Sequence, residues 1–268
     1  MFFAGIDVGS RTTKAAVLDP AGNIVSSKII ETGVHGRQAA EQVLVSCLEK
    51  AGIDRRDVVK IVSTGYGKSR VDSASLHMTE ISCHARGAFH LFPGTRTVID
   101  IGGQDSKAIL LDRSGGVADF VMNDRCAAGT GRFLEFMAEV LDMDILRMAA
   151  IPFAAAQTRP ISSLCTVFAE SEVISLLAEG CAVEDIVRGL HASVAERTAA
   201  LVQRISYASP ITMTGGVAKN KGVVDALQER IKLSLNIPEE PQIVGAVGAA
   251  WIARNTAAKS PGKPVKRL

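Results

Sequence analysis

One segment of this sequence occurs twice, and the repeat limits the possible folds more than any other feature. Residues 6–19 align without gaps onto residues 99–112, with Ile, Asp, Gly, Lys, Ala, Leu and Asp at matching places. Each copy soon reaches a further glycine, Gly22 in the first and Gly115 in the second. Two copies so far apart exclude a solenoid, which needs several adjacent repeats. The sequence therefore predicts a duplicated domain.

Each copy begins as a strand, a tight turn and a second strand. Apolar residues precede Gly9 and Ser10, which permit a sharp reversal, and a second apolar run follows. The segment DPAGN at residues 19–23 predicts a turn, because proline presets the backbone of the second turn position. The predicted strands are residues 2–8, 14–18 and 24–30 in the first copy and residues 96–101, 106–111 and 117–122 in the second.

Apolar residues at helical spacing occupy the segments between these strands. A stripe over residues 39–51 ends at Gly52, a typical helix terminator. Residues 210–214 predict a strand that enters the Gly215-Gly216 turn. Further helices are predicted at residues 194–205, 218–231 and 243–253, and the last of these is rich in small residues that suit close packing.

These elements predict an α/β protein with a duplicated fold. The first domain comprises residues 1–95 and a C-terminal helix, 243–258, that returns to it. The second domain comprises residues 96–242 and contains the double glycine. A basic stretch with interleaved prolines, residues 259–268, predicts a solvated and flexible tail.

Bulk composition argues against several classes of function. The formal net charge of +2 does not indicate nucleic acid as the main partner. No apolar run approaches the roughly 18 residues of a membrane span, and the first residues do not resemble a signal peptide. The five cysteines are odd in number and scattered, unlike a secreted disulfide framework. We therefore expect a cytoplasmic protein with neither a membrane nor a nucleic-acid partner.

The repeated strand and turn carry side chains that suit phosphate. Gly9 allows backbone N–H groups to approach phosphate oxygens without a β-carbon in the way. Asp7 can hold water molecules around Mg²⁺, and Lys14 on the next strand can point back towards the phosphates. A lone Asp-x-Gly also describes plain β-turns, so the interpretation depends on its repetition. The Gly215-Gly216 turn suits close approach of adenine and ribose.

The two Asp-x-Gly turns and the double glycine, in this order, resemble the phosphate and adenosine segments of the ATPase superfamily that contains actin, sugar kinases and heat-shock ATPases. The resemblance implies two domains around a cleft for ATP or ADP, with Mg²⁺ held through water by Asp7 and Asp100. Gln104 or Asp105 would orient the attacking water, with Glu80 as a weaker alternative base. The implied nucleotide-binding residues are Asp7, Gly9, Ser10, Lys14, Asp100, Gly102, Gly103, Gln104, Gly215, Gly216 and Val217.

Cys126 and Cys165 each precede a predicted helix. Helix N-termini favour the thiolate, the form that binds metal. No Cys-x-x-Cys pair exists, so one chain cannot build the usual four-thiolate site from this pair. Two symmetry-related chains could share one iron–sulfur cluster, or both residues could be buried free cysteines. Cys47 is expected in the core, and Cys83 beside His84 is interpreted as structural rather than as a metal pair.

The segments GIDVGS, STGYGK, EISCHARGA, VIDIGGQDSK, MNDRCAAGTGRFLE, CTVFAESEVIS and MTGGVAKN resemble those of the activators of 2-hydroxyacyl-CoA dehydratases. These activators belong to a wider ATPase family that includes the electron-activating subunits of benzoyl-CoA reductase. The resemblance implies an ATPase that transfers a low-potential electron to a dehydratase. It also implies that Cys126 and Cys165 hold a 4Fe–4S cluster across a homodimer interface, and that ferredoxin or flavodoxin donates the electron.

Three alternatives stay open at this point. The chain could be an electron-activating subunit of benzoyl-CoA reductase or of another low-potential reductase. It could be a small-molecule kinase without a cluster, although no segment predicts a sugar or carboxylate pocket. It could also be a non-redox protein whose interactions are switched by ATP. Iron and sulfide in protein purified without oxygen would separate the redox from the non-redox alternatives.

Overall fold

A computed structural model of the chain describes residues 1–123, 126–161 and 165–257. The chain divides into two compact units. Unit 1 comprises Met1–Leu91 and the chain from Ile243 onward, and unit 2 comprises Phe92–Gln242. The basic tail predicted at residues 259–268 lies outside the described residues.

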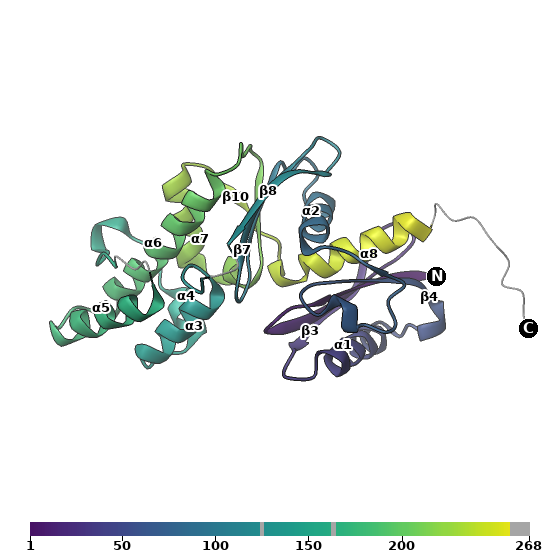
Figure 1. Cartoon of the computed structure of the whole chain (residues 1–268), viewed down its shortest axis with the longest axis horizontal. Coiled ribbons are helices and arrows are strands. Elements are labelled where there is room, and N and C mark those ends of the chain that lie inside the picture. Colours follow the sequence, from purple (N-terminus) through teal and green to yellow (C-terminus); the bar gives the residue numbers. More distant parts are fainter. Residues whose placement is uncertain (124–125, 162–164, 258–268) are drawn as a thin grey trace, which may run out of the picture. The chain divides into compact units, whose positions relative to one another are not determined.

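The elements of unit 1 are β1 (Phe2–Val8), β2 (Thr12–Leu18), β3 (Ile24–Glu31), α1 (Gly36–Ala51), η1 (Arg55–Asp57), β4 (Val58–Thr64), η2 (Lys68–Arg70), β5 (Leu76–His77), α2 (Glu80–Leu91) and α8 (Val244–Ala257). The strands form a mixed sheet in the order β3-β2-β1-β4-β5. β1 pairs antiparallel with β2 and parallel with β4, because α1 carries the chain back between β3 and β4. α1 packs over β2 and β3, and α8 packs over β1 and β4 and alongside α2 (Figure 1).

Glycines allow α8 to approach both α2 and the sheet. A β-carbon on Gly248 of α8 would overlap the carbonyl oxygen of Cys83, and one on Gly87 of α2 would overlap that of Val244. Gly5 of β1 lies equally close to the backbone of α8 at Ala246. The close packing predicted for the small residues of this helix is therefore confirmed.

Gly248→Ala should destabilise the protein by about 2 kcal/mol, because the overlap with backbone outweighs the better helix propensity of alanine. Urea denaturation followed by circular dichroism measures the change. Asn255→Ala on the same helix removes atoms instead of adding them and should change stability by less than about 0.5 kcal/mol. Equal stability of the Gly248→Ala variant and the wild type would contradict the packing described here.

The elements of unit 2 are β6 (Thr97–Ile101), β7 (Ser106–Leu111), β8 (Val117–Asn123), α3 (Gly131–Val140), α4 (Ile145–Ala150), η3 (Ala155–Gln157), α5 (Thr166–Ala178), α6 (Val183–Val202), β9 (Ile211–Thr214), η4 (Gly216–Lys219), α7 (Lys221–Ile231) and β10 (Leu235–Asn236), and η5 (Pro241–Ile243) leads into α8. The strands follow the order β10-β9-β6-β7-β8. α6 packs on β7, β8 and α7, and α3 packs on α4 and α5. Apolar side chains of the strands and helices form one continuous core.

The duplicated α/β architecture predicted from the repeat is confirmed. Read from β8 to β10, the second sheet has the same order and pairing as the first, with β6 in the place of β1 and β9 in the place of β4. The strands predicted in both repeats are also confirmed, with ends that differ by at most two residues. The helix predicted at residues 218–231 begins later than expected, at Lys221, because η4 first continues the double-glycine turn to Lys219.

Candidate functional site

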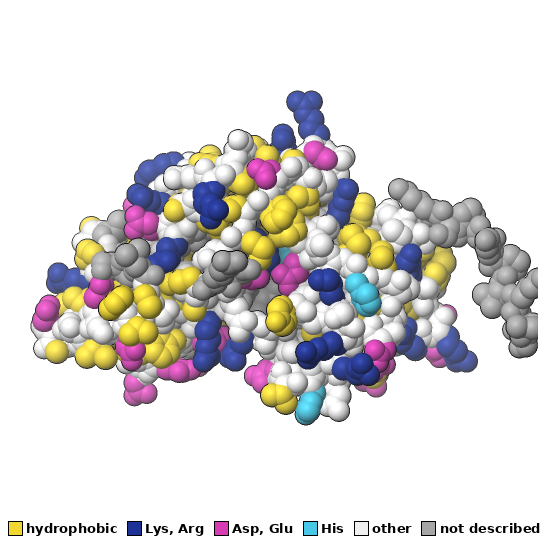
Figure 2. Space-filling view, in the orientation of Figure 1, with side chains coloured by type: hydrophobic (Ala, Val, Ile, Leu, Met, Phe, Trp, Pro, Cys, Tyr) yellow, Lys and Arg dark blue, Asp and Glu magenta, His cyan; other side chains and the backbone are white. Residues whose placement is uncertain are grey.

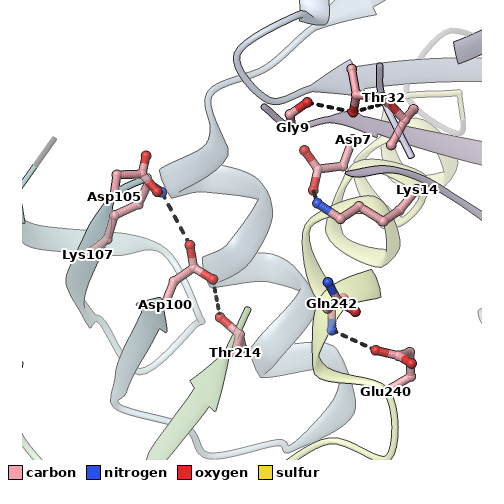
Figure 3. Close-up of polar contacts among 11 residues, drawn as sticks. Asp7, Gly9, Lys14, Thr32, Asp100, Asp105, Lys107, Thr214, Glu240 and Gln242 are labelled. Carbon is pink, nitrogen blue, oxygen red and sulfur yellow. Dashed lines mark hydrogen bonds and ion pairs between the residues drawn. The ribbon is translucent and has the colours of Figure 1, made fainter. Parts of the chain in front are cut away.

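In unit 1, Asp7 lies at the end of β1 and faces Lys14 across the β1–β2 pair. The lysine Nζ lies 3.3 Å from Asp7 Oδ2, and both side chains are largely buried. Between them, the Gly9 N–H donates to the Thr12 carbonyl at 3.1 Å, and the Thr32 hydroxyl donates to the Gly9 carbonyl at 2.8 Å (Figure 3). These contacts fix the predicted phosphate turn and leave Ser10 exposed at its tip.

The end of β4 supplies a second wall for Asp7. Thr64 pairs with Asp7 in the parallel register, and Gly65 follows with a left-handed φ of 89°. A β-carbon on Gly65 would lie 2.5 Å from Asp7 Oδ1, and one on Gly245 at the start of α8 would lie 3.1 Å from Oδ2. Glycines therefore make room for the carboxylate on two sides.

Unit 2 repeats this arrangement around Asp100. The Thr214 hydroxyl donates to Asp100 Oδ1 at 2.9 Å, and Lys107 Nζ lies 3.3 Å from Asp100 Oδ2 (Figure 3). Lys107, which is 2% exposed, also pairs with Asp105 at 2.7 Å. Buried charges of this kind are stable when they are paired, so the lysine fixes the positions of both carboxylates.

The second predicted turn is held by the start of α3. The Gly131 and Arg132 N–H groups donate to the carbonyls of Gly102 and Gly103, each at 2.9 Å. Gly102 N–H in turn donates to the Asp105 carbonyl at 2.9 Å. Of the two residues predicted to orient water, Asp105 is bound to Lys107, whereas Gln104 is exposed.

The predicted nucleoside turn follows β9. Gly215 has a φ of 86°, and its N–H donates to the Pro241 carbonyl at 3.0 Å. A β-carbon on Gly216 would lie 3.3 Å from the Gln242 amide nitrogen, which places Gln242 beside the turn. Gln242 N–H donates to the Glu240 carboxylate at 3.1 Å (Figure 3), and Val217 is buried in η4.

Sequence reasoning missed the residues that complete each turn. Thr64-Gly65 stands beside Asp7 as Thr214-Gly215 stands beside Asp100. Both pairs follow an apolar strand, so the recurring Thr-Gly was a signal in the sequence. Lys107, the counterpart of Lys14 in the repeat, was a second signal of the same kind.

The cysteine-bearing loop of unit 2 differs from its prediction. The expectation that Cys126 lies at a helix N-terminus is wrong, because α3 begins at Gly131 with Thr130 as its N-terminal flanking residue. A turn intervenes, in which Thr130 N–H and hydroxyl both donate to the Ala127 carbonyl at 3.0 and 2.6 Å, and Gly129 has a φ of 85°. Cys126 itself is half-buried. Its loop is tied to the sheet because the Ser106 hydroxyl donates to the Gly129 carbonyl at 3.1 Å.

Cys165 directly precedes α5, as predicted, and is also half-buried. The following helix exposes large apolar side chains, with Val167 at 63%, Phe168 at 67% and Ile174 at 52%. Figure 2 shows hydrophobic side chains gathered over the end of unit 2 that carries α3 and α5. Within the described residues, no group of three or more His, Cys, Asp or Glu side chains could hold a metal ion. A four-thiolate site that uses these cysteines therefore needs ligands from a second chain.

The donor chemistry of these two cysteines fits an iron–sulfur cluster better than that of Cys47 and Cys83. Cys47 and Cys83 are fully buried, and burial raises the pKa of both thiols, that of Cys83 to about 12. Buried, protonated thiols are poor metal ligands. The interpretation of Cys47 and Cys83 as structural residues agrees with this burial.

In metal-free native protein, iodoacetamide at neutral pH should modify Cys126 and Cys165 far faster than Cys47 and Cys83. The reason is that the thiolate is the nucleophile and that the core excludes the reagent. Mass spectrometry of the resulting peptides measures the extent of labelling, and protein in guanidinium provides the control in which every cysteine reacts. Rapid labelling of Cys83 in the native protein would contradict the burial seen here.

Comparison with known proteins gives a consistent result over the full chain. The sequence profile of the BadF/BadG/BcrA/BcrD ATPase family matches residues 4–253. The chain is 44% identical over 268 residues to the 2-hydroxyisocaproyl-CoA dehydratase activator of Clostridioides difficile, with 100% of both chains covered. It is 46% identical over 259 residues to the activator of lactoyl-CoA dehydratase of Anaerotignum propionicum, covering 97% of this chain and 100% of the relative. The resemblance inferred from the motifs is confirmed.

Solved structures agree with the fold. The activator of the 2-hydroxyisocaproyl-CoA dehydratase from Clostridium difficile, with bound ADPNP, superimposes with a TM-score of 0.92 at 43% identity and covers 100% of both chains. A ROK family glucokinase from Streptomyces griseus gives a TM-score of 0.63 at 15% identity, covering 95% of this chain and 100% of the kinase, and shares the fold alone. A benzoyl-CoA reductase subunit of Thauera aromatica is 32% identical, covering 92% of this chain and 91% of the relative. None of the helices in the described ranges combines the length and apolar character that a bilayer crossing needs.

Proposed function

Because the chain belongs to the BadF/BadG/BcrA/BcrD ATPase family, we propose that it is the ATP-hydrolysing activator of a 2-hydroxyacyl-CoA dehydratase. One observation supports this role above the others. The ATPase fold carries two half-buried cysteines, Cys126 and Cys165, on segments that a sugar kinase of the same fold has no reason to contain.

In the proposed site, each unit binds part of the nucleotide through its acidic turn. In unit 1, Asp7 holds water molecules on Mg²⁺, and Lys14 offsets phosphate charge. In unit 2, Asp100 has the same role, and Lys107 holds it and Asp105 in place. Gly215, Gly216 and Val217 contact the nucleoside. Phosphoryl transfer to water depends mainly on positioning and charge neutralisation, so Gln104 or Asp105 needs to do little more than orient that water.

Cys126 and Cys165 are the proposed thiolate ligands of a cluster shared by two copies of the chain. A 4Fe–4S cluster, when bound, supplies one-electron chemistry at low potential. The exposed apolar side chains of α5, next to Cys165, give a second copy a surface to bury. Ferredoxin or flavodoxin is the proposed electron donor.

The phosphate turn and the cysteine loop are connected within unit 2. Gly131 and Arg132 bind the carbonyls of Gly102 and Gly103, and Ser106 binds the carbonyl of Gly129. A nucleotide that shifts the Gly102-Gly103 turn therefore acts on the loop that carries Cys126. ATP can change the properties of that loop to the extent that it binds two conformations with different affinity.

The main competing function is the electron-activating subunit of benzoyl-CoA reductase. The identity of 32% to the reductase subunit from Thauera aromatica is below the 44% and 46% found for two dehydratase activators. This difference favours the activator. The comparisons give no support for the kinase, since the glucokinase shares the fold alone.

Anaerobic purification tests the proposal. The protein should be brown, contain about four iron and four sulfide ions per two chains, and elute as a dimer that binds ADP. A monomer that binds ADP and contains neither iron nor sulfide would preserve the ATPase assignment and remove the electron-transfer function.

A further inference from the structure

The core of unit 2 contains a histidine that the proposed mechanism does not use. His191 of α6 is 0% exposed, and burial lowers its pKa to about 4, so the imidazole is neutral. Its Nε2 lies 3.2 Å from the side-chain nitrogen of Asn220. Among the described residues, its Nδ1 has no hydrogen-bond partner. The ring is therefore held in place by a single polar contact, and that contact is with Asn220.

Asn220 joins the nucleoside turn to the next helix. Its Oδ1 accepts from the Val223 N–H at 3.0 Å and so caps α7. Its backbone N–H donates to the Val217 carbonyl at 2.9 Å and so closes η4. Because Oδ1 is already the acceptor for Val223, the amide NH₂ donates to His191 Nε2, which assigns the ring proton to Nδ1.

The neighbouring glycine allows the ring to reach this position. A β-carbon on Gly222 of α7 would overlap the His191 ring. Gly222 therefore leaves space in the first turn of α7 for the imidazole. Asn220, Gly222 and His191 form one interlocked unit beneath the turn that starts at Gly215.

We propose that His191 is a positioning residue for nucleotide binding, which acts through Asn220 to hold Val217 and the Gly215-Gly216 turn in the conformation that receives the nucleoside. The inference rests on the proposed nucleotide site. The physical reason is that a buried amide donor is costly to leave without an acceptor. If the acceptor is removed, Asn220 turns to find another partner, and η4 loses its closing contact.

Replacement of His191 by leucine and by glutamine separates this role from simple packing. Leucine fills the space without an acceptor, whereas the glutamine Oε1 can take the place of Nε2. The KM for ATP and the Kd for ADP of His191→Leu should rise about 10-fold, with kcat within about twofold of the wild type, as expected for one unsatisfied buried donor. His191→Gln should restore both constants to within about twofold of the wild type.

Asn220→Ser provides a second variant in case His191→Leu does not fold. Serine still caps α7 but is too short to reach His191, so the Kd for ADP should rise by a similar factor. If Asn220→Ser or a folded His191→Leu variant binds ADP as the wild type does, the inference is wrong and the nucleotide site stands. If the wild type itself binds no ADP in calorimetry, the proposed function and this inference fail together.

Discussion

Replacement of Cys165 by alanine should yield a colourless protein that still hydrolyses ATP but activates no dehydratase. The cysteine lies half-buried at the start of α5, in a unit whose nucleotide turns are built from other residues. Removing one thiolate from each of two chains leaves two of four ligands, which is too few to hold a 4Fe–4S cluster. Iron and sulfide analysis, the visible absorption spectrum and ATPase activity measure the three consequences in one preparation. Cys126→Ala should give the same result.

Cys181→Ala is the matched control, because Cys181 is also half-buried in unit 2 but follows the end of α5. Iron content and dehydratase activation of this variant should equal those of the wild type. An iron content unchanged in both Cys126→Ala and Cys165→Ala would show that the cluster, if present, has other ligands.

The second large effect is expected at the acidic turn of unit 2. Asp100→Asn should lower kcat/KM for ATP hydrolysis by about 10- to 100-fold, the usual effect of losing a group that orients metal-bound water. The fold should survive, because the amide oxygen can still accept from Thr214 and Lys107 keeps its pair with Asp105. Steady-state kinetics at several Mg²⁺ concentrations measure the change, and added Mg²⁺ should restore part of the activity.

Asp112→Asn is the control for this experiment. Asp112 is the last aspartate of the same repeat, but it lies exposed in a turn, where it accepts from the backbone of Ser114 and Gly116. Hydrolysis by this variant should match the wild type within about twofold, as for surface substitutions away from a site. A full rate in Asp100→Asn would place the Mg²⁺ site elsewhere.

Local signals explain why much of the fold could be predicted from the sequence. The strands of both repeats alternate with glycine turns, and α1 ends at Gly52 with a φ of 65°, as its glycine terminator predicted. The pairing of β1 with β4 could not be predicted in this way, because α1 separates them in the chain. The walls that Thr64 and Gly65 form beside Asp7 depend on that long-range pairing.

The errors at the site have related physical causes. Helical composition after Cys126 predicted a helix but not its first residue, which is set by the turn between Ala127 and Thr130. The apolar environment of His191 gave no sign of its bond to Asn220, since the two residues lie on different helices. Buried polar contacts between distant segments leave little pattern in the sequence. Composition and spacing located the turns, whereas tertiary contacts decide what completes them.

The most direct test supplies the reduced, iron-containing protein with dehydratases that act on 2-hydroxyisocaproyl-, lactoyl- and 2-hydroxyglutaryl-CoA, without oxygen, with ATP or with ADP. Formation of the unsaturated acyl-CoA is followed by chromatography. We predict that at least one dehydratase becomes active with ATP and remains inactive with ADP. Activation that is equal with ATP and ADP would contradict the claim that nucleotide hydrolysis drives electron transfer from this chain.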